Sequence, residues 1–189
     1  VPARRGLVHW AGNGRTGPRL FLVAGAALLA LDPADGAPVP SFGDGGSVAI
    51  GEATAAPAVV GDRLVATTNA PATVRAFDVE TGRELWRTPL MADGTPIGAA
   101  PWGGFAVDAA RNRAYVTTGN PRPPLYGAGR PGNNEHANSV VCVDLATGAR
   151  SILSGEDRGS GPRLSATAAV LFAPAGVRLA GAGLWWSAA

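Results

Sequence analysis

The sequence predicts an all-β fold, a partial β-propeller of about three four-stranded antiparallel blades. Gly and Pro, at 27 and 16 residues of 189, exceed the roughly 12% of average chains, which favours many turns between short strands. Three similar segments supply the repeat: LLALDPADG, VRAFDVETG and VVCVDLATG, which begin at Leu28, Val74 and Val140. Each is typical of an apolar strand that ends in Asp and reverses direction at Gly. Because closed propellers typically have four to eight blades, the chain is expected to be part of a larger ring.

Strands are expected where a short apolar run is bounded by Gly, Pro, Asn or Asp. In chain order these runs cover residues 6–10, 18–25, 28–32, 56–60, 63–68, 74–79, 83–90, 103–109, 112–119 and 140–144. Asp32, Asp78 and Asp144 follow the third strand of each unit. They are expected to form turns, because an Asp side chain accepts hydrogen bonds from backbone N–H groups two residues later.

Other short motifs are also interpreted as turns. GNGRTG, which starts at Gly12, has the G-x-G-x-x-G spacing, but Pro18 and a strand follow it where a dinucleotide site requires a helix. GDGG, at 43–46, is expected to be a turn between blades. His9 and His136 have no Cys or His at metal-ligand spacing, so zinc is not expected.

Charge and composition exclude several classes of function. The 16 basic residues are all Arg and are scattered, and the net charge is +2, so no basic face for nucleic acid is expected. Cys142, in the apolar run SVVCVDL, is expected to be a buried thiol. The most apolar segments contain Arg, Pro and Gly, so no transmembrane helix is predicted. The opening VPARRGLVHW is not a signal peptide, and its first residue suggests an incomplete N-terminus.

Two stretches resemble a known family. AFDVETGRELW, which ends at Trp86, resembles the tryptophan-docking motif of quinoprotein dehydrogenases, in which the Trp of one blade packs against the next blade. APWGGFAVDAARNRAYVTTGNPRPPLYGAGRPGNN resembles the part of alcohol and glucose dehydrogenases dependent on pyrroloquinoline quinone (PQQ) that contains a cofactor-stacking Trp and a metal-ligating Asn. The resemblance runs from about Gly6 to Arg150. It implies that residues 1–150 form part of a propeller whose parent has eight blades.

The resemblance also implies a site. Trp102 would be the aromatic floor beneath PQQ, and Asn120, eighteen residues later, would be a ligand of a metal ion, Ca²⁺ in most of the family. Thr54 and Asn69 correspond to polar cofactor contacts. The long loop that follows Asn120, rich in Pro, Gly and Asn, would cover the edge of the site. The alternatives are a blade-packing aromatic residue for Trp102 and a turn residue for Asn120.

Two departures from the family pattern affect catalysis. The alcohol-dehydrogenase branch has a metal-ligating Glu in the loop after the second strand of the preceding blade, whereas this chain has Ala72 near that place. Residues 151–189 match nothing in the family, although the catalytic aspartate is expected there. Asp157 is the only Asp in this tail and lacks the matching surroundings, so no catalytic residue is assigned. The tail is interpreted as frameshifted or as weakly structured and disordered.

The implied function is oxidation of an alcohol or sugar hydroxyl. In the family, an aspartate takes the hydroxyl proton, hydride passes to the quinone and Ca²⁺ polarises the adjacent carbonyl. The implied partners are a small alcohol or sugar substrate and a cytochrome or quinone as electron acceptor, and the implied compartment is the periplasm. The chain is expected to be inactive as given, because the catalytic segment is missing. The alternative is a non-catalytic propeller that scaffolds protein interactions, since such propellers share the tryptophan motif.

Overall fold

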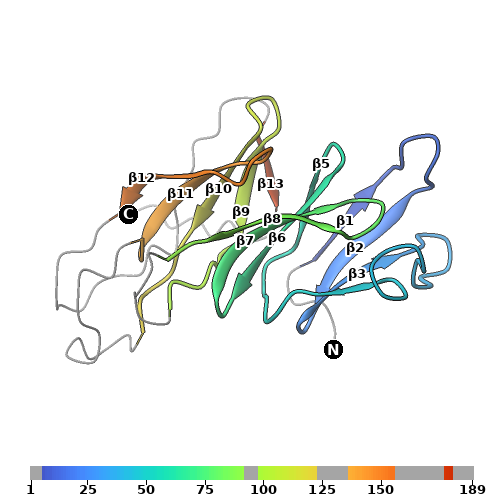
Figure 1. Cartoon of the computed structure of the whole chain (residues 1–189), viewed down its shortest axis with the longest axis horizontal. Helices are drawn as coiled ribbons and strands as arrows, with labels where there is room; N and C mark the ends of the chain where they lie inside the picture. Colours follow the sequence, from blue (N-terminus) through green and yellow to red (C-terminus); the bar gives the residue numbers. More distant parts are fainter. Residues whose placement is uncertain (1–5, 92–97, 123–135, 156–176, 181–189) are drawn as a thin grey trace, which may run out of the picture.

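The computed structural model describes residues 6–91, 98–122, 136–155 and 177–180, which form only strands, turns and loops. The strands are short, as Figure 1 shows. In chain order they are β1 (Leu7–Trp10), β2 (Arg19–Ala24), β3 (Ala27–Leu31), β4 (Ser47–Ala49), β5 (Ala58–Val60), β6 (Arg63–Asn69), β7 (Ala72–Asp78), β8 (Glu84–Pro89), β9 (Phe105–Asp108), β10 (Arg113–Thr117), β11 (Ser139–Asp144), β12 (Arg150–Gly155) and β13 (Val177–Ala180).

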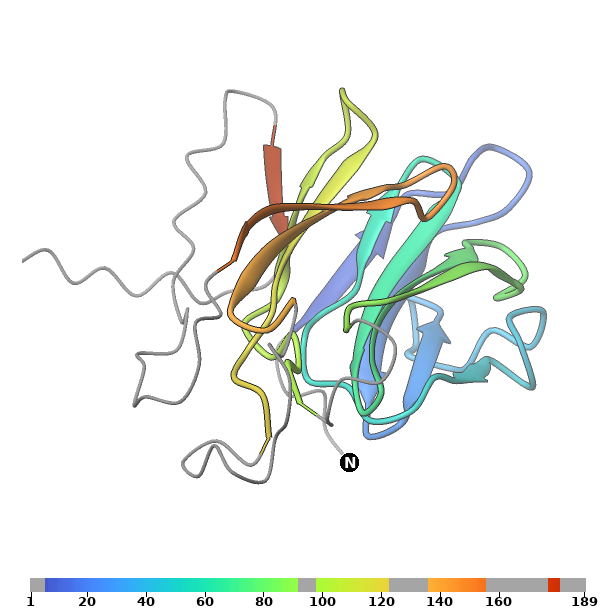
Figure 2. The same ribbon diagram turned by 60° about the vertical axis from the view of Figure 1, so that its left-hand side comes forward.

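The strands form three antiparallel sheets, each built from four consecutive strands. The first has the order β1-β2-β3-β4 and the second β5-β6-β7-β8. The third has the order β12-β11-β10-β9-β13, so a fifth strand is added beside β9. Figures 1 and 2 show the three sheets following one another side by side. The predicted arrangement of three four-stranded blades is confirmed.

The repeated Asp residues form the predicted turns. The Oδ1 atom of Asp32 accepts a hydrogen bond from the backbone N–H of Ala34 at 2.8 Å. Asp78 and Asp144 accept one from the N–H group three residues later, at 2.7 Å and 3.0 Å. Hydrogen bonds from the backbone and side chain of Thr147 lower the pKa of Asp144, outweighing the effect of burial. These carboxylates are therefore occupied in holding the turns between the third and fourth strands.

We number the three sheets as blades 1, 2 and 3 in chain order. Blade 2 packs against both of its neighbours, because successive residues of β6 point to opposite faces of the sheet. Leu64 belongs to a buried cluster shared with blade 1, whereas the next residue, Val65, belongs to one shared with blade 3. The first cluster contains Trp10, Phe21, Val23, Leu28, Ala30, Phe42, Ile50, Ala53, Leu64, Ala66, Phe77 and Val79. The second contains Ala58, Val65, Ala72, Val74, Leu90, Phe105, Val107, Ala114, Val116, Val141, Val143 and Leu145.

The junction between blades 2 and 3 is held by an aromatic residue. The indole Nε1 of Trp86 donates a hydrogen bond to the Leu145 carbonyl at 3.0 Å. Gly148, in the same turn, has a φ of 75°, and an added Cβ atom there would lie 2.9 Å from the indole ring. Trp86 therefore has the packing role that the docking motif predicts.

The junction between blades 1 and 2 has a different aromatic residue in the corresponding place. Phe42 is fully buried, and its Cε2 atom would lie 3.2 Å from a Cβ atom added at Gly82. Beside it, the N–H of Gly43 donates to the Thr81 carbonyl at 2.8 Å. GDGG, at 43–46, therefore lies inside blade 1, before β4. Its expected place between blades is wrong, because a strand of only three residues follows it and gives little apolar signal.

Buried Arg19 adds polar contacts across the same junction. Its guanidinium donates to the carbonyls of Val79 and Glu80 at 3.2 Å and 2.5 Å and to the Ser41 hydroxyl at 3.1 Å. It also lies 5.9 Å from the ring centroid of Trp10. A planar group with several fixed donors suits such a set of acceptors.

Four further expectations can be compared with the structure. Cys142 is buried, 6% exposed. Gly12–Gly17 lies between β1 and β2 and forms a turn, as predicted. Within the tail expected to be weakly structured, β12 extends to Gly155 and β13 pairs antiparallel with β9. Among the described residues no helix is long and apolar enough to span a membrane.

Candidate functional site

One end of the three sheets contains all four residues predicted for the site. In consecutive antiparallel strands, the turn between the second and third strands lies at the same end as the connection to the next blade. Backbone hydrogen bonds join these segments, from Asn69 N to the Glu52 carbonyl at 2.7 Å and from Ala99 N to the Asn120 carbonyl at 2.9 Å. We call this the lower end, after its place in Figure 1, and define it by residues 50–57, 69–72, 98–104 and 118–122.

Trp102 and Asn120 lie on two adjacent segments of the lower end. The bridge between Gly98 and Pro121 and the hydrogen bond from Ala99 to Asn120 align residues 98–104 with the segment that follows β10. Trp102 is 37% exposed. A Cβ atom at Gly119 would lie 2.9 Å from its Nε1, so only Gly lets the indole lie this close to the chain. The structure thus brings the predicted aromatic floor beside the predicted metal ligand.

Thr54 and Asn69 contact each other directly. The Nδ2 atom of Asn69 donates to the Thr54 hydroxyl at 3.3 Å. The Oδ1 atom of Asn69 is buried and has no hydrogen-bond partner among the described residues. Buried polar atoms are normally hydrogen-bonded, so this acceptor is suited to a donor from a bound molecule. The two residues predicted from the cofactor resemblance therefore form one polar unit.

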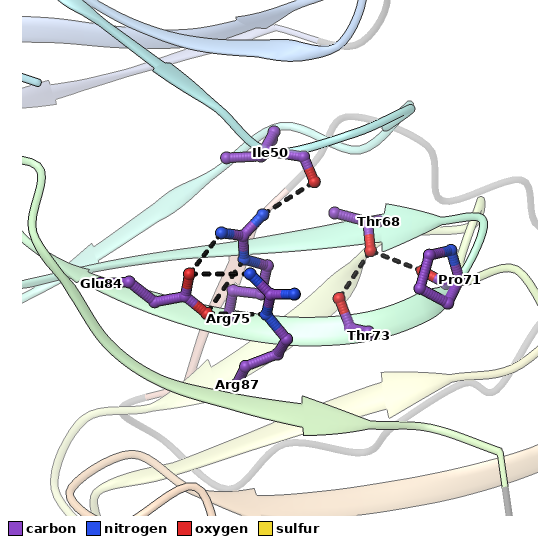
Figure 3. Close-up of polar contacts among 7 residues, drawn as sticks. All are labelled: Ile50, Thr68, Pro71, Thr73, Arg75, Glu84 and Arg87. Carbon is purple, nitrogen blue, oxygen red and sulfur yellow. Dashed lines mark hydrogen bonds and ion pairs between the residues drawn. The ribbon is translucent and has the colours of Figure 1, made fainter. Parts of the chain in front are cut away.

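A hydroxyl pair shapes the turn that presents Asn69. Figure 3 shows Thr68 and Thr73 facing each other across this turn. Their Oγ1 atoms are 2.6 Å apart, and the Thr68 hydroxyl also donates to the Pro71 carbonyl at 2.7 Å. Both threonines are buried. The turn between β6 and β7 is therefore fixed from within.

A charged group anchors the segment that contains Thr54. Arg75 is buried and donates from Nη1 to the Ile50 carbonyl at 2.8 Å, as drawn in Figure 3. Glu84 pairs with Arg75 at 2.5 Å and with Arg87 at 2.8 Å. Hydrogen bonds from Arg87, and then from Arg75, lower the pKa of Glu84 to about 2 against the opposing effect of burial. The carboxylate thus stays charged and balances the buried guanidinium.

The described residues do not complete a calcium site. Ca²⁺ takes six to eight oxygen ligands, often including carboxylates. Ala72, near the place of the Glu in the alcohol-dehydrogenase branch, is 5% exposed and packs in the core between blades 2 and 3. No group of three His, Cys, Asp or Glu side chains that could hold a metal ion occurs among the described residues. Asn120 alone does not complete such a site.

Two further polar residues of this region were not among the residues predicted for the site, and of the two only His136 was considered from the sequence, as a zinc ligand. His136 and Asn138 lie before β11, and the N–H of Asn138 donates to the Gly119 carbonyl at 3.1 Å. The Nδ1 atom of His136 and the Oδ1 atom of Asn138 are buried without hydrogen-bond partners among the described residues. Nothing in the local sequence marks them, because they follow a long loop and belong to no motif. Asp157 and the RPGNN segment, 130–134, lie outside the described residues.

Comparison with known proteins places the chain in a family. The family described as glucose/ethanol/alcohol dehydrogenase, beta-propeller domain, matches residues 1–151. Methanol dehydrogenase [cytochrome c] subunit 1 of Methylobacterium organophilum is 30% identical in an alignment 183 residues long. This match covers 76% of this chain and 29% of that protein. The glycerol dehydrogenase large subunit of Gluconobacter oxydans is 30% identical in an alignment 156 residues long. This match covers 64% of this chain and 21% of that protein.

Solved structures give the same fold. The quinohemoprotein alcohol dehydrogenase from Comamonas testosteroni superposes with a TM-score of 0.62 at 23% identity, over 82% of this chain and 27% of that one. A europium-containing methanol dehydrogenase gives a TM-score of 0.60 at 19% identity, over 78% of this chain and 31% of that one. The chain thus spans less than a third of the length of these relatives. By its sequence match over residues 1–151, the chain belongs to the family of PQQ-dependent glucose, ethanol and alcohol dehydrogenases, in their β-propeller domain.

Proposed function

We propose that the chain forms the PQQ-binding part of a dehydrogenase that oxidises an alcohol or sugar hydroxyl. The observation that supports this most strongly is the packing of Trp102 on Gly119 beside Asn120. A large, partly exposed indole whose neighbouring position must be Gly offers a flat contact surface. An aromatic contact of this kind contributes roughly 0.5–1.5 kcal/mol beyond burial.

Thr54 and Asn69 are proposed to bind polar groups of the same cofactor. The Thr54 hydroxyl can donate and accept, and the buried Asn69 Oδ1 can accept. Because both lie at the lower end, they can act together with Trp102. When bound, PQQ supplies the two-electron oxidising centre that accepts hydride from the substrate. The chain itself would hold the cofactor in place, through the turn between β6 and β7 and the segment before β9.

Calcium is proposed only as the ion that Asn120 would contact in the parent protein. The described residues do not complete its coordination, so no step of the reaction is assigned to it. The proton-accepting aspartate is likewise not assigned, and we propose that the chain as given does not turn over substrate. A cytochrome or quinone acceptor and a periplasmic location follow from the family resemblance and are part of this proposal.

Titration with PQQ tests the proposed function. The 189-residue chain is titrated with PQQ while tryptophan fluorescence is recorded, and the same titration is made with Trp102→Ala. The control is Leu7→Ala in β1, which removes the other large apolar side chain that is exposed among the described residues and is not one of the residues proposed to bind the cofactor. We expect quenching by PQQ in the wild-type chain and in Leu7→Ala, and binding at least about tenfold weaker in Trp102→Ala.

If PQQ does not bind, or if Trp102→Ala and Leu7→Ala bind it equally, the proposed cofactor site is wrong. A propeller that scaffolds protein interactions would then be the better explanation.

A further inference from the structure

The segment that enters β11 has an unusual combination of backbone strain and unpaired polar atoms. His136 and Asn138 have φ angles of 73° and 49°, in the left-handed region that residues other than Gly rarely adopt. Each also has a buried side-chain atom, Nδ1 and Oδ1, without a hydrogen-bond partner among the described residues. Strained non-glycine residues are concentrated at binding sites, where the surrounding structure maintains them.

Thr118 holds these two residues in their strained conformations. Its hydroxyl donates to the His136 carbonyl at 2.6 Å and accepts from Ser139 N at 2.9 Å. The backbone N–H of Thr118 donates to the Ser139 carbonyl at 2.9 Å. Thr118 and Ala137 are each 1% exposed. The strained segment is thus fixed on both sides of Ala137 and adjoins Gly119, next to Asn120.

The chemistry of the unpaired atoms restricts what they can bind. An amide Oδ1 accepts hydrogen bonds, so it needs a donor, which an ionised carboxylate of a quinone cannot provide. A hard cation takes oxygen ligands, whereas Nδ1 of the His136 imidazole is a nitrogen atom, so such a cation would leave it unpaired. A hydroxyl group both donates and accepts. It can therefore serve the Asn138 oxygen and the His136 nitrogen in either tautomer of the imidazole.

From this geometry we propose that His136 and Asn138 form a hydroxyl-binding subsite that selects a polyhydroxylated substrate, a sugar or polyol, over an alcohol with a single hydroxyl group. The inference rests on the proposed function, because it assumes that the substrate approaches the lower end beside Asn120. An alcohol with one hydroxyl places that group at the reacting position and has none left for this subsite. A sugar or polyol has further hydroxyl groups that can reach it.

The test measures binding of sorbitol and of ethanol to the 189-residue chain by calorimetry, in the presence of PQQ and Ca²⁺. The main variant is Asn138→Gly, in which Gly adopts the left-handed backbone without strain and the amide is removed. Asn112→Gly is the matched control, because Asn112 has a φ of 54° but lies in the turn between β9 and β10, at the opposite end. Asn138→Asp keeps an acceptor oxygen in a residue that also tolerates this backbone.

We expect the Kd for sorbitol to rise about 3- to 10-fold in Asn138→Gly, as for loss of one hydrogen bond. It stays within about twofold of wild type in Asn112→Gly and Asn138→Asp, as does the Kd for ethanol in every variant. His136→Gly, which also relieves the backbone, weakens sorbitol binding in the same direction. Without ligand, Asn138→Gly melts at the wild-type temperature or above, because an unpaired buried acceptor has been removed.

Several outcomes overturn the subsite. These are a sorbitol Kd unchanged by Asn138→Gly, weaker Ca²⁺ binding in that variant without a change for sorbitol, and no sorbitol binding although PQQ quenches the fluorescence. If sorbitol binds in an Asn138-dependent way while PQQ does not bind, the subsite stands and the proposed function is wrong. If neither binds, both are wrong.

Discussion

Trp86 and Gly148 are in such close contact that a Cβ atom at Gly148 would lie 2.9 Å from the indole ring. The two residues belong to adjacent blades, and the Trp86 indole also hydrogen-bonds the Leu145 carbonyl at 3.0 Å. Each turn of this kind needs a Gly for its positive φ, but here the Gly is needed for a second reason. The neighbouring aromatic ring leaves no room for a side chain.

Substitution of this Gly separates the two effects. Gly148 and Gly36 have nearly the same φ, 75° and 74°, but an added Cβ atom at Gly36 would meet nothing within 4 Å. Gly36→Ala is expected to lower the free energy of unfolding by about 1–2 kcal/mol, the cost of a left-handed backbone. Gly148→Ala is expected to lower it by a further ~1–3 kcal/mol because of overpacking. Urea denaturation of both variants measures the difference, and equal losses would show that the contact with Trp86 is not tight.

Gly119→Ala is expected to disturb the contact surface for the cofactor. The added methyl group would lie 2.9 Å from Trp102 Nε1 and 3.0 Å from the Ala100 carbonyl, so the indole must move. We expect about tenfold weaker PQQ binding, measured by fluorescence titration. Gly17→Ala is the control, because a Cβ atom there meets nothing within 4 Å. Unchanged affinity in Gly119→Ala would argue against Trp102 as the floor of the site.

Acid is expected to weaken the anchor formed by Arg75 and Glu84. The pKa of Glu84 is lowered from 4.5 to about 2, below its value in the unfolded chain. The pair therefore stabilises the fold fully above about pH 4.5, and this contribution is lost as the pH falls from there toward 2. Glu84→Gln should be less stable than wild type at pH 7, because buried Arg75 loses its counter-charge, and the difference should narrow at low pH.

Denaturation midpoints at pH 7 and pH 3 measure this narrowing. Glu52→Gln, at an exposed position, serves as the control for loss of a carboxylate and should be about as stable as wild type at pH 7. A difference between Glu84→Gln and wild type that stays constant with pH would mean that the carboxylate contributes through packing alone.

Replacement of Arg19 by Lys is expected to weaken the junction between blades 1 and 2. A single ammonium group cannot reproduce the forked contacts to the Val79 and Glu80 carbonyls and the Ser41 hydroxyl. We expect a loss of about 1–3 kcal/mol in the free energy of unfolding, because buried acceptors remain without donors. Arg15→Lys, at an exposed position, should be neutral. An equally stable Arg19→Lys variant would contradict this role.

The blade pattern could be predicted from the sequence because each signal is local. An apolar run, an Asp and a Gly define the hairpin around Asp78, and the structure has the predicted hydrogen bonds there. β4 could not be predicted, since its three residues pair with β3 only after a long loop whose position depends on the neighbouring blade. Phe42 was missed for the same reason, because its burial depends on Gly82.

The candidate site was predicted in part. Trp102, Asn120, Thr54 and Asn69 could be named from the family resemblance, and the structure brings them to one end, although their binding roles are still proposals. His136 was considered only as a zinc ligand and Asn138 was not considered, because their distinguishing properties are a positive φ and buried unpaired atoms. Both properties arise from hydrogen bonds to Thr118 and Gly119, which no pattern in the sequence specifies.

The alternation of Leu64 and Val65 between two buried clusters has a consequence for folding. Where repeated units contact only their nearest neighbours, the stability includes one interface energy for each pair of neighbouring units. Blade 2 forms both of the described interfaces, and blades 1 and 3 form one each. Of the two described interfaces, opening of blade 1 or blade 3 breaks one, whereas opening of blade 2 breaks both. Amide hydrogens of β6 should therefore exchange more slowly than those of β2 or β10. Of the three described blades, blade 2 would therefore be the last to open, because it takes part in both buried clusters.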